Sequence, residues 1–282
     1  QRQMCIRDSN LAAAGHDVVG YDPIAPYPEG VAKVASGKDA ARGRDVVITM
    51  LPDGEILRAV AGDIVPTMVK GAVFLDCSTV DVESARAVAK QATGAGLRAL
   101  DAPVSGGIGG AEAGTLTFMV GGSDDAFAEA APLFEIMGQK AVHCGPSGNG
   151  QAAKICNNMI LGATMVATCE AFALADKLGL DRQAMFDVVS TSSGYSWTMN
   201  AYCPAPGIGP KSPADNNYIP GFASELMLKD LRLSQQAAEA ADADTPMGRM
   251  ARDQYAQFVE AEDGRGQDFS AMLPRFEKRG RS

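Results

Sequence analysis

Through residues 17–144, short runs rich in β-branched residues alternate with alanine-rich segments of helical type. The runs are DVVGYD (17–22), DVVITML (45–51), AVFLDCS (72–78), LRALDAP (97–103), LTFMVGG (116–122) and KAVHC (140–144). Several of them are near-continuous apolar runs, which is typical of strands that are covered on both faces. Helical segments such as 82–92 and 124–137 lie between them. The alternation predicts an α/β fold with a doubly wound, mostly parallel sheet.

In the second half of the chain, strand patterns nearly vanish and helical patterns replace them. Residues 151–178 predict one long helix, and Asp181 is placed to cap the helix that follows. Further helical stretches lie at 224–241, 246–262 and 270–279. At roughly 150 residues per domain, the 282 residues suggest two domains. We therefore predict an α/β domain over 1–146 and an all-helical domain over 147–282.

The chain is acidic, because 25 Lys and Arg residues against 34 Asp and Glu residues give a net charge of −9. This balance argues against a nucleic-acid partner and against a polybasic membrane anchor. The most apolar long stretch, 155–175, carries Asn157, Asn158 and Glu170. We therefore interpret it as a buried helix of a soluble protein and expect no membrane partner. No targeting segment is visible, so a cytoplasmic location is expected.

The chain offers little for a metal centre or a disulfide scaffold. It has two histidines, His16 and His143, which argues against a multi-histidine metal site. Its six cysteines are scattered without a C-x-x-C pair. We expect no metal and interpret the cysteines as reduced thiols in a core.

Asp22 ends the run VVGYD, where an acidic residue can bind the ribose of a dinucleotide. Pro23 favours an extended backbone at Asp22, and a carboxylate there repels a 2′-phosphate, which favours NAD over NADP. An ordinary turn aspartate is an equally simple explanation. A G-x-G-x-x-G loop should precede such a residue by roughly 20 positions. It is missing, because residues 1–14 contain no glycine.

A G-x-G-x-x-A pattern does occur further along the chain, in GNGQAA (148–153). It follows a predicted strand and opens a predicted helix, as a dinucleotide-binding loop does. However, that helix is long and leads to further helices, not to a strand that ends in an acidic residue. We therefore reject this segment as the dinucleotide loop.

The segment DAPVSGGIGGAEAGTL (101–116) is rich in glycine and has two explanations. It can be a flexible loop between two strands. Alternatively, its backbone amides can bind an anion, with Ser105 adding a hydroxyl donor. Because we expect a loop between strands here and not a helix start, a small carboxylate is a better candidate ligand than a phosphate.

Lys154 lies near the start of the long predicted helix, four residues before Asn158. Residues at i and i+4 share a helix face, so an ammonium and an amide can converge there on one ligand atom. A lysine on a largely apolar helix either extends to solvent or is functional, and a lysine of lowered pKa can exchange a proton near neutral pH. The pair Lys229–Asp230 is a weaker signal, since alone it is an ordinary exposed pair.

Together these segments resemble the β-hydroxyacid dehydrogenase family. The shared motifs are ITMLP (48–52), DCSTVD (76–81), DAPVSGG (101–107), GTLTFMVGG (114–122), GNGQAAKICNNM (148–159) and LMLKDL (226–231). The likeness to members that act on 3-hydroxyisobutyrate rests on SSGYSW (192–197), PAPG (204–207) and ADNNY (214–218). The resemblance runs from about Asn10 to the C-terminus and implies a Rossmann-type domain followed by an all-helical C-terminal domain.

The resemblance also implies roles for individual residues. The catalytic lysine of the family falls on Lys154. The substrate-binding residues fall on Ser105, Gly106, Gly107, Asn158 and Phe222. The cofactor contacts fall on Asp22, Leu51, Pro52, Thr79 and Lys229.

The start of the chain departs from the family pattern. NLAAAGH (10–16) matches, but QRQMCIRDS (1–9) stands where the family's first strand and glycine loop belong. Aligned without gaps, the last family glycine falls on Met4 and the middle one on Gln1. We therefore expect residues 1–9 to be non-native sequence and the first domain to be incomplete at its start, with weaker NAD binding as the consequence.

The activity implied by the resemblance is the oxidation of 3-hydroxyisobutyrate to methylmalonate semialdehyde with NAD, a step of valine catabolism and so of branched-chain amino acid catabolism. Lys154 is the implied proton acceptor. One alternative is a reductase of tartronate semialdehyde or a related short aldehyde acid. Another is a truncated, non-catalytic helical module that no longer binds NAD. Family members are usually dimers or tetramers, so a homodimer or homotetramer is expected.

Overall fold

The computed structural model describes residues 2–27 and 30–278, and it shows two compact units, Gln1–Lys154 and Ile155–Ser282. The first unit has the predicted α/β architecture, and the second is helical. The predicted fold, a Rossmann-type domain followed by an all-helical domain, is therefore confirmed. The domain boundary predicted between residues 146 and 147 stays a prediction.

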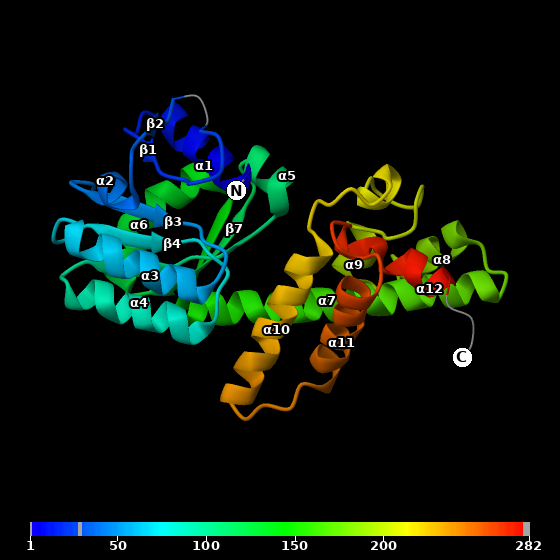
Figure 1. Cartoon of the computed structure of the whole chain (residues 1–282). Helices are drawn as coiled ribbons and strands as arrows, with labels where there is room; N and C mark the ends of the chain where they lie inside the picture. Colours follow the sequence, from blue (N-terminus) through cyan, green and yellow to red (C-terminus); the bar gives the residue numbers. More distant parts are fainter. Residues whose placement is uncertain (1, 28–29, 279–282) are drawn as a thin grey trace. The chain divides into compact units, whose positions relative to one another are not determined.

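The first unit is built on a six-stranded sheet with the order β3-β4-β5-β7-β6 and with β8 beside β7 (Figure 1). Its strands are β3 (Val46–Thr49), β4 (Val73–Asp76), β5 (Arg98–Asp101), β6 (Val104–Ser105), β7 (Thr117–Gly122) and β8 (Lys140–Gly145). Strands β3, β4 and β5 pair in parallel, as do β7 and β8, whereas β7 is antiparallel to β5 and β6. A separate parallel pair joins β1 (Val19–Gly20) and β2 (Ala32–Lys33). All six predicted runs contain strands, whereas the short strands β2 and β6 were not predicted.

Helices cover both faces of the six-stranded sheet. The helices of this unit are α1 (Arg2–Ala13), α2 (Gly37–Ala41), α3 (Gly54–Ile64), η1 (Val65–Thr67), α4 (Val82–Gly94), α5 (Gly107–Glu112) and α6 (Asp124–Met137). Successive side chains of a strand point to opposite faces. Phe74 of β4 accordingly packs with α3 and α4, while Val73 and Leu75 pack with α1 and α6. Coverage of both faces explains why the strand sequences are near-continuous apolar runs.

Two helices of the first unit differ from the sequence-based expectation. Segment 101–116 was expected to be a loop between strands, and this was wrong, because it contains β6 and the short helix α5. Its N-cap, Gly106, has a φ of +130°, a conformation that glycine adopts readily. Residues 2–9, expected to be non-native, form one helix with 10–13, namely α1. The origin of residues 1–9 stays a prediction, and Gln1 lies outside the described residues.

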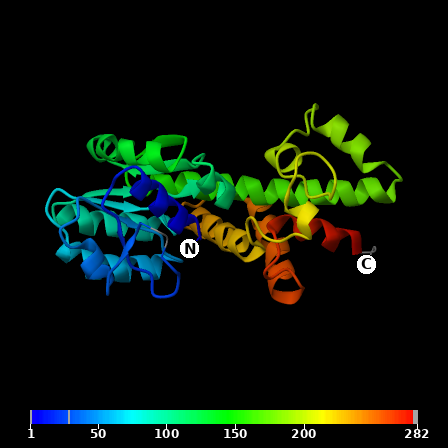
Figure 2. The same cartoon turned by 90° about the horizontal axis from the view of Figure 1, so that it is seen from above.

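The second unit is helical. Its elements are most of α7 (Asn149–Lys177), α8 (Arg182–Val189), α9 (Trp197–Asn200), η2 (Pro213–Asn216), α10 (Ser224–Ala240), α11 (Pro246–Ala261), η3 (Phe269–Ala271) and α12 (Met272–Lys278). The long predicted helix is confirmed as α7, which is one continuous helix (Figure 2). Asp181 caps α8 as predicted, since its Oδ1 accepts a hydrogen bond from Ala184 N at 3.0 Å.

Helix α7 is long and apolar enough to cross a membrane by length and composition alone. Half of its most apolar window is buried inside the protein. Met165, Cys169 and Phe172 of this helix lie fully buried in the core of the second unit, against Tyr255 and Phe269. This burial agrees with the interpretation of α7 as a core helix.

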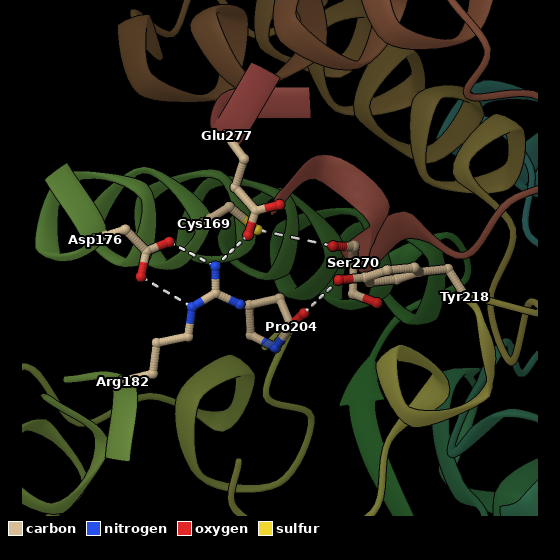
Figure 3. Close-up of polar contacts among 7 residues, drawn as sticks. All are labelled: Cys169, Asp176, Arg182, Pro204, Tyr218, Ser270 and Glu277. Carbon is tan, nitrogen blue, oxygen red and sulfur yellow. Dashed lines mark hydrogen bonds and ion pairs between the residues drawn. The ribbon is translucent and has the colours of Figure 1, made fainter. Parts of the chain in front are cut away.

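An arginine ties three helices of the second unit together (Figure 3). Arg182 of α8 donates a hydrogen bond from Nε to Asp176 Oδ1 of α7 at 2.9 Å and pairs with Glu277 of α12. The hydrogen bond raises the pKa of Arg182 and lowers that of Asp176. In the same region Tyr218 Oη donates to Pro204 O at 2.8 Å. The last helix, α12, is therefore held to the rest of the unit by charge as well as by apolar packing.

The cysteines whose side chains are described are all free thiols. Cys77, Cys169 and Cys203 are buried, and burial raises the pKa of each thiol. The expected core position is wrong for Cys144, which is half-buried, and for Cys156, which is exposed.

Candidate active site

Several predicted cofactor residues follow the carboxyl ends of parallel strands, where open α/β sheets bind their ligands. Leu51 and Pro52 follow β3, and Thr79 follows β4. Leu51 and Thr79 are half-buried, and Pro52 is exposed. Leu51 N donates a hydrogen bond to Ser78 Oγ at 2.8 Å, which holds the turn after β3 against the loop after β4. These two segments therefore form one edge of the sheet.

Asp22 follows β1 and is half-buried. Its Oδ1 accepts hydrogen bonds from Ile24 N and Ala25 N, both at 2.8 Å, so it is a turn aspartate. Its Oδ2 accepts no hydrogen bond from the described residues, and it can therefore face the hydroxyls of a ribose. The two explanations of Asp22 are compatible, because a carboxylate with one oxygen in a turn can still accept hydrogen bonds from the ribose of NAD.

The predicted carboxylate-binding residues lie at the junction of β6 and α5. Ser105 is the last residue of β6 and is half-buried, and Gly107 is the first residue of α5. Gly106 and Gly107 both have positive φ, +130° and +64°. The first amides of a helix have no acceptor within the helix. The hydroxyl of Ser105 and these backbone amides can together bind a small carboxylate.

Lys154 lies in the second turn of α7 and is 8% exposed. It belongs to the first unit, together with Ser105, Gly107 and Thr79. An amine that is nearly excluded from solvent is suited to exchange a proton with a bound ligand and not with bulk water.

In the second unit, Asn158, Asp230 and Lys229 form one polar group. Asn158 Nδ2 donates to Asp230 Oδ2 at 2.5 Å, and Lys229 Nζ lies 3.8 Å from Asp230 Oδ1. Asp230 is 3% exposed, so the interpretation of Lys229–Asp230 as an ordinary exposed pair was wrong. The buried face of α10 combines Met227, Asp230 and Leu231 at helical spacing, and this signal could have predicted the burial of Asp230.

Phe222 is half-buried and is held by Asp268. The Asp268 carboxylate is fully buried and accepts hydrogen bonds from Phe222 N at 3.0 Å and from Tyr202 Oη at 2.9 Å. The Phe222 ring meets Phe269 edge-on, with 5.6 Å between centroids. Burial, with the Asp268 charge, raises the pKa of Tyr202. Asp268 was not predicted from the sequence.

Three buried polar residues near the carboxyl ends of the parallel strands were also not predicted as site residues. Asp76, Asp101 and Gln151 are 3%, 3% and 0% exposed. Each belongs to a motif that was singled out for other residues. The available signal for the two aspartates was their place at the end of apolar runs, in AVFLDCS (72–78) and LRALDAP (97–103), because an acidic residue there meets the ends of neighbouring strands.

Two family models match consecutive parts of the chain. Residues 7–145 match the model described as NAD binding domain of 6-phosphogluconate dehydrogenase. Residues 148–276 match the model described as NAD-binding of NADP-dependent 3-hydroxyisobutyrate dehydrogenase.

Individual relatives cover nearly the whole chain. A 3-hydroxyisobutyrate dehydrogenase of Pseudomonas aeruginosa is 44% identical over 273 residues, which are 94% of this chain and 92% of that protein. An NAD-dependent L-serine dehydrogenase of the same species is 42% identical over 255 residues, 88% and 86% of the two chains. The structure of a Mycobacterium tuberculosis 3-hydroxyisobutyrate dehydrogenase with L-serine is similar with a TM-score of 0.93 and 44% identity, covering 97% of this chain and 95% of that one.

Proposed function

Because the chain belongs to the 3-hydroxyisobutyrate dehydrogenase family of NAD-dependent 3-hydroxyacid dehydrogenases, we propose that its substrate is 3-hydroxyisobutyrate. The product is methylmalonate semialdehyde, and the reaction serves valine catabolism. The observation that carries the proposal is the buried Lys154, in the same compact unit as the turn formed by Ser105, Gly106 and Gly107. A proton acceptor and a carboxylate-binding turn are the two protein parts that a 3-hydroxy acid requires.

We assign the substrate carboxylate to Ser105, Gly106 and Gly107, whose hydroxyl and amides stabilise its charge by donating hydrogen bonds. Lys154 Nζ accepts the proton of the substrate hydroxyl as the carbon–oxygen bond becomes a carbonyl, and it returns that proton in the reverse reaction. NAD supplies the acceptor for the hydride that leaves the hydroxyl-bearing carbon. Asn158 and Phe222 complete the set of substrate-binding residues in this proposal.

We assign cofactor binding to Asp22, Leu51, Pro52, Thr79 and Lys229. The half-buried carboxylate of Asp22 supports a preference for NAD, because it accepts ribose hydroxyls and repels a 2′-phosphate. The comparisons favour an enzyme over the non-catalytic helical module, since the relatives reported above are dehydrogenases over nearly their whole length.

L-serine is the second candidate substrate. It is supported by the L-serine dehydrogenase relative and by the L-serine in the similar Mycobacterium tuberculosis structure. L-serine is also a 3-hydroxy acid, with an ammonium where 3-hydroxyisobutyrate has a methyl group. A site that prefers the methyl group needs an apolar wall, and one that prefers serine needs an acceptor for the ammonium.

The test compares kcat/KM for 3-hydroxyisobutyrate, L-serine and glycerate, each with NAD and with NADP, by the absorbance of the reduced cofactor. We expect the highest value for 3-hydroxyisobutyrate with NAD. A higher value for L-serine overturns the substrate assignment, and a higher value for glycerate supports the tartronate semialdehyde alternative.

Lys154→Ala tests the mechanism. It should abolish turnover while the circular dichroism spectrum and NAD affinity stay those of the parent. Lys154→Arg, which keeps the positive charge but is a poor proton acceptor, should be equally inactive. An active Lys154→Ala variant removes Lys154 from the mechanism.

We further propose that the protein is a cytoplasmic homodimer or homotetramer. Ile160 and Leu174 of α7, and Leu178 directly after it, are more than half exposed, at 61%, 58% and 74%, which supports association through the second unit. Analytical ultracentrifugation should show a single species of two or four chains. A monomer at micromolar concentration contradicts this proposal.

A further inference from the structure

The carboxylate of Asp101 binds the first turn of α7. Asp101 is the last residue of β5, and its Oδ1 accepts a hydrogen bond from Gly148 N at 2.7 Å. Its Oδ2 accepts one from Gln151 N at 2.9 Å. A carboxylate at this position satisfies amides that the helix cannot satisfy itself and interacts favourably with the helix dipole. Both oxygens are therefore engaged by the start of the helix that carries Lys154.

Glycines make this close approach possible. A Cβ at Gly121 of β7 would lie 2.5 Å from Asp101 Oδ1. A Cβ at Gly150 of α7 would lie 2.5 Å from Asp101 O and would also clash with Met119 O. Hence Gly150 of the GNGQAA segment lets strand backbone and a protein carboxylate approach α7. This is a role for the G-x-G-x-x-A pattern that was rejected as a dinucleotide loop.

Gln151 links the same helical turn to the loop after β4. Its side chain is fully buried, its Oε1 accepts from Val80 N at 3.1 Å, and its Nε2 donates to Ser78 O at 2.8 Å. These two contacts flank Thr79, a predicted cofactor contact. Gln151 is three residues before Lys154, so the two side chains lie on neighbouring positions of one helix face.

We propose that Asp101 and Gln151 are positioning residues for the dehydrogenase reaction. Asp101 fixes the position of the first turn of α7 along the helix axis and its rotation about that axis. Gln151 fixes the distance between that turn and the loop that contains Thr79. Together they set where Lys154 Nζ lies relative to the cofactor-binding edge. The inference rests on the proposed role of Lys154, because it explains how that amine is held in register. A misplacement of about 1 Å costs about a hundredfold in rate when it affects reacting groups.

The first variant is Asp101→Asn. It keeps the shape of the side chain but places an NH2 group opposite a backbone N–H and removes the negative charge. We expect kcat to fall about ten- to a hundredfold, with KM for the hydroxy acid changed by less than about threefold. The primary deuterium isotope effect on kcat should rise, because hydride transfer becomes more rate-limiting.

The second variant is Gln151→Glu, which keeps the acceptor for Val80 N and replaces the donor to Ser78 O with an oxygen. We expect weaker NAD binding in calorimetry in addition to a lower kcat. The matched control is Asp181→Asn, which alters the same kind of contact at α8, where Asp181 Oδ1 accepts from Ala184 N at 3.0 Å. It should leave kcat, the isotope effect and NAD affinity unchanged.

Amide hydrogen exchange gives a readout that is independent of activity. In Asp101→Asn the amides of residues 148–154 should exchange faster than in the parent, while those of β4 stay the same. If the parent oxidises no hydroxy acid, the proposed function fails, and the exchange comparison still tests the contact. The positioning role is overturned by unchanged exchange in this segment. It is also overturned if kcat falls only in proportion to the folded fraction, with the isotope effect unchanged.

Discussion

Asp76 should make the stability of the first unit fall as pH rises. The carboxyl is 3% exposed at the end of β4, and burial raises its pKa from 3.8 to about 6. Hydrogen bonds from Thr49 Oγ1 at 2.7 Å and Ser78 Oγ at 2.6 Å oppose this rise, and the nearby Asp101 charge adds to it. Both of these hydrogen bonds reach Oδ1, and Oδ2 has no hydrogen-bond partner among the described residues.

The magnitude follows from linkage between protonation and folding. Between pH 3.8 and about 6 the folded state binds more protons at Asp76 than the unfolded state does, so the free energy of unfolding falls as pH rises. Each pH unit of pKa difference is worth about 1.4 kcal/mol. The loss is therefore about 3 kcal/mol, absent below pH 3.8 and complete above about pH 6. About half of it falls between pH 5 and pH 8.

Asp76→Asn removes this titration while it keeps an oxygen that accepts from Thr49 and Ser78. Urea unfolding of both proteins at several pH values between 5 and 8 gives the difference in the free energy of unfolding, from which groups common to both proteins cancel. Relative to the variant, the free energy of unfolding of the parent should fall by about 1.5 kcal/mol from pH 5 to pH 8. Circular dichroism reports the whole chain, and fluorescence of the single tryptophan, Trp197, reports the second unit. The Asp76 effect should appear in the circular dichroism transition.

Thr49→Val is the matched control for the direction of the effect. It removes a hydrogen bond that stabilises the carboxylate form of Asp76, so it should extend the loss of stability to higher pH. A difference between the parent and Asp76→Asn that is constant with pH would refute the reasoning. It would show that Asp76 is ionised in the folded protein without penalty.

Three further predictions concern single side chains. Gly150→Ala should lower the free energy of unfolding by about 1–3 kcal/mol, because its Cβ would clash with Met119 O and Asp101 O. The control Gly62→Ala places its Cβ in open space on α3, so it should leave the free energy of unfolding unchanged or raise it. Chemical denaturation measures both. Arg182→Met should destabilise the second unit by about 1 kcal/mol or less, since the ion pairs with Asp176 and Glu277 are partly exposed; Trp197 fluorescence during urea unfolding measures this. Asp22→Ser should raise the ratio of kcat/KM with NADP to that with NAD about tenfold or more, and an unchanged ratio would contradict the ribose role of Asp22.

The sequence predicted the parts of the fold that depend on patterns along the chain. The apolar runs that form β3, β4 and β5 are short and are covered on both faces. The helical sequence pattern that forms α7 continues over a long stretch of the chain. The sequence did not predict α5, because GGIGGAE is a poor helix former and each helical glycine costs about 1 kcal/mol relative to alanine. Tertiary packing overrides that preference, since Ala111 is fully buried and a Cβ at Gly110 would touch Leu116.

For a similar reason, the sequence predicted the residues of the candidate site that lie in motifs but not the buried groups that hold them in place. Residues such as Ser105 and Lys154 were found through motifs, which are read along the chain. The groups that hold them depend on strand pairing and on contacts distant in sequence. Asp76 and Asp101 are partners in the register of β4 and β5. Asp101 also accepts a hydrogen bond from Gly148 N, which lies 47 residues further along the chain. No spacing in a single sequence indicates which helix start a buried carboxylate will reach.

The GNGQAA segment shows why a glycine pattern alone is ambiguous. A dinucleotide loop uses glycines so that an anion, the pyrophosphate, can approach the amides at a helix start. Here Asp101 is the anion, and Gly150 and Gly121 allow the same approach for a carboxylate of the protein itself. Both cases satisfy the same orphan amides and the same helix dipole, so they require the same residues. The two cases differ in which anion reaches the helix start, and only the neighbouring strand determines that. An acidic residue at the end of the adjacent strand takes the position that the phosphate of a ligand would occupy. The glycine segment then binds a carboxylate of the protein itself, and this contact holds the helix start against the strand.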